Sequence, residues 1–332
     1  MQMTLKICFS FHNERWILTP ILFKTNYLKI LKHKIHMKKL SLIICLFFAF
    51  TLANAQQKKV LNILAIGAHP DDCDSKFGGT AALFAKMGHN VKFLALTNGD
   101  AGHQDMGGGP LAKRRREEAK KAALALGIAE YEVLDNHDGE LFPTLNVRLE
   151  VIRRIRNWNA DIVLGLRPND YHPDHRNAGS VVQDAAYMNI VPNVAPDTPP
   201  LQKNPVFLYM SDNFQKPYPF QKDIAVIVDE VIDTKVKGLA AHESQMFEWG
   251  PWTNGTDLST IPTGEKERLA WLKERWMNRK PDASTLLALK KWYPGVDVSK
   301  VSQVEFFEIC EYGKQPTDQE IREMFPMLGS KK

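Results

Sequence analysis

From residue 59 onward, short apolar runs that suit buried strands alternate with segments of helical periodicity. The expected strands are residues 60–67, 91–97, 131–134, 162–166, 206–210 and 224–228, and the expected helices are residues 78–87, 111–126, 145–157, 177–189, 232–242 and 266–276. Strands separated by helices require βαβ crossovers, which produce a parallel sheet with helices on both faces. The alternation therefore predicts a doubly wound, Rossmann-like α/β fold with a mostly parallel sheet.

The 332-residue chain divides into four segments. Residues 37–55 have the layout of a secretory signal peptide, with two lysines, an apolar run and an Ala-x-Ala ending. We expect residues 1–36 to be an untranslated or disordered extension, residues 56–248 to form the α/β domain, and residues 249–332 to be a C-terminal elaboration packed on it. The mature chain then begins near Gln56, is secreted or periplasmic, and has no stable membrane span; an uncleaved membrane anchor is the alternative.

The basic composition of the whole chain comes from its first 55 residues. These hold eight Lys/Arg and one acidic residue, so removing their charge of +7 changes the formal net charge from +5 to −2. A mature chain near −2 gives no reason to expect nucleic-acid binding. Two cysteines remain after residue 55, Cys73 and Cys310, and we expect both to be free thiols rather than a disulfide.

The first polar motif, Ala68-His69-Pro70-Asp71-Asp72, directly follows the first expected strand. A hydrolytic zinc site uses three protein ligands and keeps one position open for water. Imidazole and carboxylate suit zinc, Fe²⁺ or a similar divalent ion. We expect His69 and Asp72 to be ligands and Asp71 to be the general base that takes a proton from the attacking water.

The second polar motif, His172-Pro173-Asp174-His175, follows the fourth expected strand. One of its histidines can complete the metal site, and the other can donate a hydrogen bond to the developing oxyanion. Asp174 is available to orient and charge that second histidine. Parallel sheets bind ligands beyond the carboxyl ends of their strands, so we expect the two motifs to meet in space.

With both motifs in place, residues 59–246 resemble the PIG-L/LmbE-like family of metal-dependent de-N-acetylases. Members of that family remove acetyl groups from N-acetylglucosamine conjugates. The resemblance implies zinc ligands at His69, Asp72 and His175, with Asp71 as base and His172 as the oxyanion-stabilising residue. It therefore assigns the two histidines that the residues alone leave interchangeable.

Three further stretches resemble family features. Arg115 and Asp138 correspond to residues that bind substrate, and His242-Glu243-Ser244-Gln245 matches a late family segment. The structural alternatives are a solvated charge for Arg115, a turn for Asp138 and a helix-end histidine for His242. Some members place a Tyr two residues before the first His of the second motif. Here that position is Asp170 and the Tyr is Tyr171, so a catalytic role for this Tyr is in doubt.

These features predict an exported zinc hydrolase that removes an N-acetyl or other N-acyl group from an amino-sugar glycan or glycoconjugate. The alternatives are a metallo-amidase acting on a non-sugar substrate and a non-catalytic exported protein that binds metal or glycan. The tryptophans at 249, 252, 271, 276 and 292 either stack on sugar faces or belong to the core.

Overall fold

The computed structural model describes residues 59–277 and 282–329, together with residue 33. The predicted signal peptide and, apart from residue 33, the predicted N-terminal extension lie outside the described residues. In the described part of the chain, no helix has both the length and the hydropathy that a membrane span requires. The expectations about export therefore stay predictions.

Seven strands form one mixed sheet in the order β3-β2-β1-β4-β5-β7-β6. Strands β1 to β5 are parallel, and β7 is antiparallel to both of its neighbours. The strands are β1 (Asn62–Gly67), β2 (Asn90–Thr97), β3 (Glu130–Asn136), β4 (Ile162–Gly165), β5 (Val206–Met210), β6 (Ile224–Ile227) and β7 (Val304–Gly313). The predicted α/β fold with a mostly parallel sheet is confirmed.

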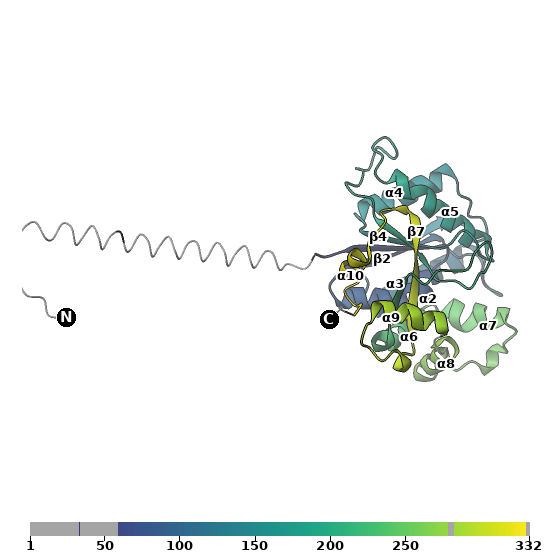
Figure 1. Cartoon of the computed structure of the whole chain (residues 1–332). Coiled ribbons are helices and arrows are strands. Elements are labelled where there is room, and N and C mark those ends of the chain that lie inside the picture. Colours follow the sequence, from purple (N-terminus) through teal and green to yellow (C-terminus); the bar gives the residue numbers. More distant parts are fainter. Residues whose placement is uncertain (1–32, 34–58, 278–281, 330–332) are drawn as a thin grey trace, which may run out of the picture. The chain divides into compact units, whose positions relative to one another are not determined.

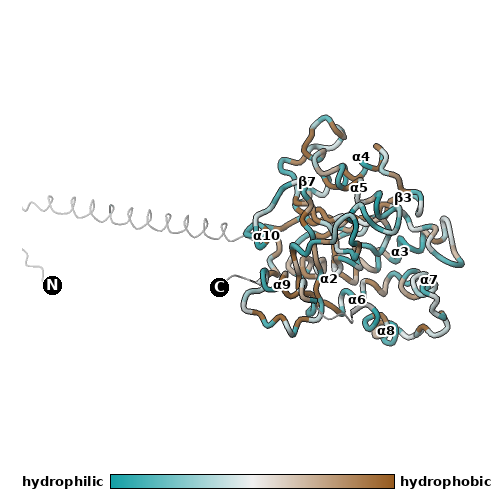
Figure 2. Tube along the Cα trace, turned by 45° about the vertical axis from the view of Figure 1, so that its right-hand side comes forward, coloured by the Kyte–Doolittle hydropathy of each residue, from teal (hydrophilic) through white to brown (hydrophobic). Residues whose placement is uncertain are grey.

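Helices cover both faces of this sheet, with α4 and α5 on one side and α2, α3, α6 and α9 on the other (Figure 1). Strands buried on both faces need near-continuous apolar runs, and hydrophobic residues accordingly gather in the central strands in Figure 2. The helices are α2 (Asp72–Lys86), α3 (Gly108–Leu126), α4 (Leu145–Asn157), α5 (Pro173–Met188), α6 (Ile232–Ala241), α7 (Gly250–Thr253), α8 (Glu265–Met277), α9 (Ala283–Trp292) and α10 (Asp318–Met324), with a π-helical turn, η2, at Ser244–Trp249.

The strand order reverses between β1 and β4, which are neighbours in the sheet although about a hundred residues separate them. Ile63 pairs with Ile162 and Ala65 with Leu164, so both strands end at the same edge. In open α/β sheets this switch point forms a crevice between the loops that follow the two strands. The two polar motifs occupy those two loops.

The C-terminal segment does more than pack on the domain. Strand β7, which the helical interpretation of residues 249–332 missed, inserts between β5 and β6 and runs antiparallel to both. Its Phe307 is fully buried in the main hydrophobic core. Residues after 249 therefore complete the sheet as well as covering it.

Two helices begin earlier than their apolar periodicity indicates. Helix α2 starts at Asp72 rather than at residue 78, and α5 starts at Pro173 rather than at residue 177. The first turns of both helices carry the polar motifs, which hide the helical pattern.

Cys73 and Cys310 are buried free thiols, as predicted.

We predict that Gly179→Ala, in α5, destabilises the protein. A Cβ on Gly179 would lie 2.7 Å from the Leu166 carbonyl oxygen at the end of β4. The helix would have to move off the strand, at a cost of about 1–3 kcal/mol in the free energy of unfolding. Gly78→Ala in α2 is the matched control, because its nearest atom would be 3.5 Å away.

Urea unfolding of both variants measures this difference. Gly78→Ala should be neutral or stabilising by up to about 1 kcal/mol, because Ala favours a helix more than Gly does. Equal stabilities for Gly179→Ala and the wild type would show that α5 does not pack against β4 as closely as described.

Candidate metal centre

Three loops at the carboxyl edge of the sheet supply the predicted site residues. The loop after β1 carries His69, Asp71 and Asp72, and the loop after β4 runs into His172, Asp174 and His175 at the start of α5. Asp138 follows β3. Because β1 and β4 are adjacent and parallel, these side chains come together, and all of them except the buried Asp174 line one cavity of about 700 Å³.

The three predicted metal ligands lie close to one another. His69 Nδ1 and His175 Nε2 are 3.1 Å apart. Asp72 Oδ1 lies 3.4 Å from His175 Nε2, and Asp72 Oδ2 lies 3.8 Å from His69 Nδ1. Donor atoms around a tetrahedral zinc ion are about 3.3 Å apart, given zinc–ligand bonds of about 2.0–2.1 Å. The two histidine nitrogens therefore have about the spacing of two donors on one zinc-sized ion, and the Asp72 carboxylate lies beside them.

In His69 and His175, the ring nitrogen that does not face the other histidine contacts a carboxylate. His69 Nε2 lies 3.0 Å from Asp138 Oδ1 and 3.3 Å from Asp174 Oδ2. His175 Nδ1 lies 3.0 Å from Asp170 Oδ1. A ring N–H donated to a carboxylate leaves a lone pair on the opposite nitrogen and makes that nitrogen a better ligand. The lone pairs of His69 and His175 are thereby directed toward each other.

The electrostatics of the cluster favour a cation at this point. Burial lowers the pKa of His69, but its hydrogen bonds to Asp138 and Asp174 outweigh burial and raise that pKa to about 10. Burial also opposes ionisation of Asp72, yet His175 and His69 hold its pKa below the usual value. Buried acidic groups that stabilise a positive charge on imidazole can equally stabilise a bound divalent ion.

Two groups of side chains have one possible ligand atom each within 4.8 Å of one another, and neither group contains Asp72. They are His69 with His172 and His175, and His69 with Asp138 and Asp174. In the first group, His172 Nδ1 is already occupied, because it accepts the backbone N–H of Asp174 at 3.2 Å. In the second, the carboxylates face the nitrogen of His69 that points away from His175. The arrangement of tautomers favours the set that contains Asp72.

A glycine lets Asp72 reach this position. A Cβ on Gly67, the last residue of β1, would lie only 2.6 Å from Asp72 Cβ. The Asp72 carboxylate is fixed by the backbone N–H groups of Ala68 and His69, both at 2.9 Å from Oδ2. The chain thus bends back on itself directly after the strand, and the first turn of α2 presents the carboxylate to both histidines.

Asp71 occupies the N-cap position of α2 with a φ angle of 141°. A non-glycine residue seldom adopts such a φ, and strain of this kind gathers at functional sites. Burial and the adjacent Asp72 carboxylate raise the pKa of Asp71 to about 6. A carboxylate with a pKa near neutrality is suited to accept and return a proton.

The two predicted substrate-binding residues line the same cavity. Arg115 is 1% exposed, so it is not a solvated charge. Its Nη1 lies 3.7 Å from Asp138 Oδ2, and Asp138 also contacts His69. Asp138 is therefore linked to the metal cluster as well as to the cavity wall, a position that its sequence context did not indicate.

The second motif differs from expectation in one respect. The Asp174 carboxylate does not contact His172, the histidine that we expected it to orient. It contacts His69 Nε2 and accepts the backbone N–H groups of Gly139 and Leu141 at 2.7 and 3.1 Å. The reason is that Asp174 lies in the first turn of α5 and its side chain contacts the segment after β3.

Sequence reasoning missed the role of Asp170. Its carboxylate accepts from His175 Nδ1 and from the His172 backbone N–H, both at 3.0 Å. The available signal was a carboxylate five residues before a predicted ligand.

Tyr171 is 74% exposed, and its ring lies edge-on to His172 and His175, at centroid distances of 5.8 and 5.5 Å.

Residues 242–245 contact α2, α3 and the loop after β1, which all carry predicted site residues. His242 is fully buried, with Nε2 3.2 Å from Asp74 Oδ2. Ser244 donates its backbone N–H and its hydroxyl to Glu118 at 2.9 and 2.6 Å. The Gln245 side-chain amide donates to the Pro70 carbonyl within the first metal loop. His242 is thus a helix-end histidine, whereas Gln245 lines the cavity.

The C-terminal tryptophans divide between cavity and core. Trp249 and Trp271 line the metal cavity, and Trp252 stacks on Trp249 at a centroid distance of 5.3 Å. Trp292 is fully buried in the core. The side chain of Trp276 lies outside the described residues.

The sequence of this chain is similar to a family profile and to several known proteins. A family profile described as "PIG-L: GlcNAc-PI de-N-acetylase" matches residues 64–186. A diacetylchitobiose deacetylase of Thermococcus kodakarensis is 34% identical over 200 residues, which cover 58% of this chain and 74% of that protein. A probable N-acetyl-alpha-D-glucosaminyl L-malate deacetylase 2 of Bacillus cereus is 28% identical over 195 residues, covering 55% of this chain and 83% of that protein.

Solved structures share the fold at lower identity. The N,N'-diacetylchitobiose deacetylase of Pyrococcus horikoshii superposes with a TM-score of 0.57 at 22% identity, covering 75% of this chain and 83% of that chain. GalB of Pseudomonas putida, a 4-carboxy-2-hydroxymuconate hydratase, superposes with a TM-score of 0.59 at 17% identity, covering 78% and 99%. One fold thus hosts different reactions. The sequence matches, in contrast, establish that the chain belongs to the PIG-L/LmbE-like family of metal-dependent de-N-acetylases.

Proposed function

We propose that this protein is an exported zinc-dependent hydrolase that removes an N-acetyl group from an N-acetylglucosamine-type sugar or glycoconjugate. The observation that carries the proposal is the pair of histidine ring nitrogens 3.1 Å apart, with the Asp72 carboxylate beside them and Asp71 next to it. The names of the relatives from T. kodakarensis and B. cereus support an amino-sugar substrate. Two imidazoles and one carboxylate are a donor set that suits hydrolytic zinc.

Asp71 and His172 would carry the proton and charge movements of the reaction. His69, Asp72 and His175 would hold a divalent ion, which would supply Lewis-acid chemistry when bound. Asp71 takes the proton from the water as its oxygen forms a bond to the acyl carbon. When the carbon–nitrogen bond breaks, Asp71 returns that proton to the departing nitrogen, leaving acetate and a free amino sugar.

In this proposal His172 stabilises the charge that develops on the acyl oxygen. Because its Nδ1 accepts the Asp174 backbone N–H, the proton of the neutral ring lies on Nε2. Burial and the neighbouring His69 lower the pKa of His172, which keeps the ring neutral. A neutral ring with Nε2–H can still donate a hydrogen bond to an oxyanion.

The ligand assignment predicts different metal contents for two histidine variants that lie three residues apart. In His175→Ala the zinc content should fall from about one ion per chain to nearly none, because one of the three proposed metal ligands is lost. His172→Ala should keep the ion and lose turnover. Elemental analysis of both purified variants measures the contrast, and loss of zinc from His172→Ala to the same extent would refute the assignment.

Replacing the proposed base should separate binding from turnover. Asp71→Asn is nearly isosteric, so it should retain zinc while acetate release falls by about 10²–10⁴-fold. Asp233→Asn is the matched control, because the Asp233 side chain is 77% exposed and pairs with Lys273. The assay compares N-acetylglucosamine derivatives with N-acyl amino acids.

The substrate panel also tests the alternatives. Hydrolysis of the acyl amino acids alone would indicate a non-sugar amidase. Bound zinc without hydrolysis of any substrate in the wild type would indicate a binding protein. Undiminished acetate release by Asp71→Asn would remove Asp71 from the reaction.

The export proposal rests on residues 37–55 and predicts cleavage after Ala55. The intact mass of the protein purified from its natural host should match a chain that begins at Gln56. A chain that retains residues 37–55 in the membrane fraction would instead identify an anchor.

A further inference from the structure

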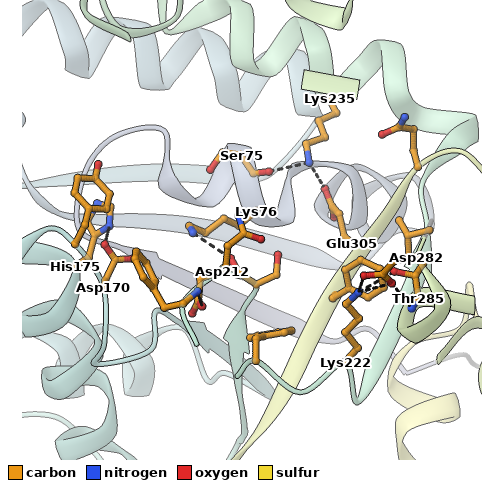
Figure 3. Close-up of a pocket in the computed structure, with 18 of the residues that line it drawn as sticks. Ser75, Lys76, Asp170, His175, Asp212, Lys222, Lys235, Asp282, Thr285 and Glu305 are labelled. Carbon is orange, nitrogen blue, oxygen red and sulfur yellow. Dashed lines mark hydrogen bonds and ion pairs between the residues drawn. The ribbon is translucent and has the colours of Figure 1, made fainter. Parts of the chain in front are cut away.

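A buried ion pair lies in the wall of a second cavity, of about 650 Å³, which shares lining residues with the metal cavity (Figure 3). The ammonium nitrogen of Lys235, on α6, lies 2.7 Å from Glu305 Oε1, on β7. The two residues are only 7% and 4% exposed. Because removing a charge pair from water costs free energy, its contacts indicate what the pair contributes.

The ion pair binds backbone groups in the middle of α2. Glu305 accepts the backbone N–H groups of Gly79 and Thr80, at 2.8 and 2.7 Å. Lys235 donates to the Ser75 carbonyl at 2.8 Å (Figure 3). In a regular α-helix the Gly79 N–H would bond to that same Ser75 carbonyl. The two side chains therefore bind both ends of one expected helical hydrogen bond.

The absence of a side chain at Gly79 lets the carboxylate approach the helix. A Cβ on Gly79 would lie 3.0 Å from Glu305 Oε1 and 2.8 Å from the Cβ of Val228, which lies between β6 and α6. In a helix interior Gly is about 1 kcal/mol less favourable than Ala. The contact with Glu305 therefore explains a residue that the helix alone would not favour.

Net stability does not account for the ion pair. A regular helix would satisfy its own backbone groups without a buried charge, and replacing a buried ion pair by apolar residues is often neutral or stabilising. What the pair adds is direction, because a hydrogen bond weakens steeply when its geometry is distorted, whereas apolar packing is non-directional. Bonds from β7 and α6 to the same part of α2 therefore fix the rotation and the axial position of that helix.

Ser75 connects this part of α2 to the first polar motif. Its backbone N–H donates to the Asp71 carbonyl at 3.0 Å, and its hydroxyl donates to the Asp72 carbonyl at 2.8 Å. Its own carbonyl accepts the hydrogen bond from Lys235. A single residue thus links the buried ion pair to the backbone of the proposed base and of a proposed metal ligand.

We propose that Lys235 and Glu305 are positioning residues of the metal centre. They hold residues 75–80 of α2 against α6 and β7. Through Ser75 they set the orientation in which Asp71 and Asp72 face the metal cavity. Both act through the backbone of α2 rather than by contact with the substrate. This inference rests on the proposed deacetylase function and adds two residues, outside both polar motifs, on which the geometry of the ligands depends.

The comparison of Glu305→Gln with Glu308→Gln tests this proposal. Both substitutions replace a buried carboxylate of β7 by an amide, but Glu308 accepts the backbone N–H of Gln221 and not one from α2. Glu305→Gln should weaken zinc binding about tenfold, as the loss of a group that orients metal ligands does. It should also shift the visible spectrum of the cobalt-loaded protein. Glu308→Gln should keep the wild-type zinc affinity and cobalt spectrum.

A charge-balanced double variant separates positioning from stability. Glu305→Gln alone leaves a buried ammonium without its counter-charge, which destabilises the protein. Lys235→Met/Glu305→Gln removes both charges and should regain most of the stability to urea. We expect its zinc affinity and cobalt spectrum to stay altered, because the bond from Lys235 to the Ser75 carbonyl is still lost.

Wild-type zinc affinity and a wild-type cobalt spectrum in the double variant would overturn the positioning role, and so would equal changes in Glu308→Gln. Acetate release keeps the two proposals separable. If the double variant matches the wild type in zinc affinity, spectrum and kcat, the positioning role fails and the deacetylase function stands. If the double variant has an altered metal site but the wild type hydrolyses no N-acyl substrate, the positioning role stands and the proposed reaction fails.

Discussion

The site depends on two imidazole lone pairs held face to face. His69 Nδ1 and His175 Nε2 are 3.1 Å apart, and carboxylates fix the proton of each ring on the opposite nitrogen. Two lone pairs at that distance repel unless a proton or a metal ion lies between them. The fold imposes the arrangement, because the reversal of strand order at β1 and β4 brings both loops to one edge. The chain thus presents a position that requires a cation.

The rest of the architecture supports that position. Gly67 lets α2 turn back closely enough to present Asp72, and Gly179 lets α5 pack against the end of β4. Gln245 donates a hydrogen bond to the Pro70 carbonyl in the loop after β1, which carries His69 and Asp71. Strand β7 completes the sheet between β5 and β6, so the C-terminal part of the chain is integral to the domain.

Local patterns predicted the parallel strands and both polar motifs, because buried strands are apolar runs and the motifs follow them directly. Strand β7 escaped prediction because Glu305 and Glu308 interrupt its apolar pattern. Both are buried beside partners that are distant in the sequence: Gly79, Thr80 and Lys235 for Glu305, and Gln221 and Arg167 for Glu308. The role of Asp170 and the orientation of Asp174 toward His69 also depend on contacts between separate loops. Sequence spacing shows which residues carry the chemistry, whereas the tertiary fold decides which of them meet.

Anomalous X-ray diffraction from zinc-loaded crystals would show where a metal ion binds. We expect one anomalous peak about 2.0–2.2 Å from His69 Nδ1, His175 Nε2 and an Asp72 oxygen. A peak coordinated by His172 in place of Asp72, or one on the Nε2 side of His69 between Asp138 and Asp174, would contradict it.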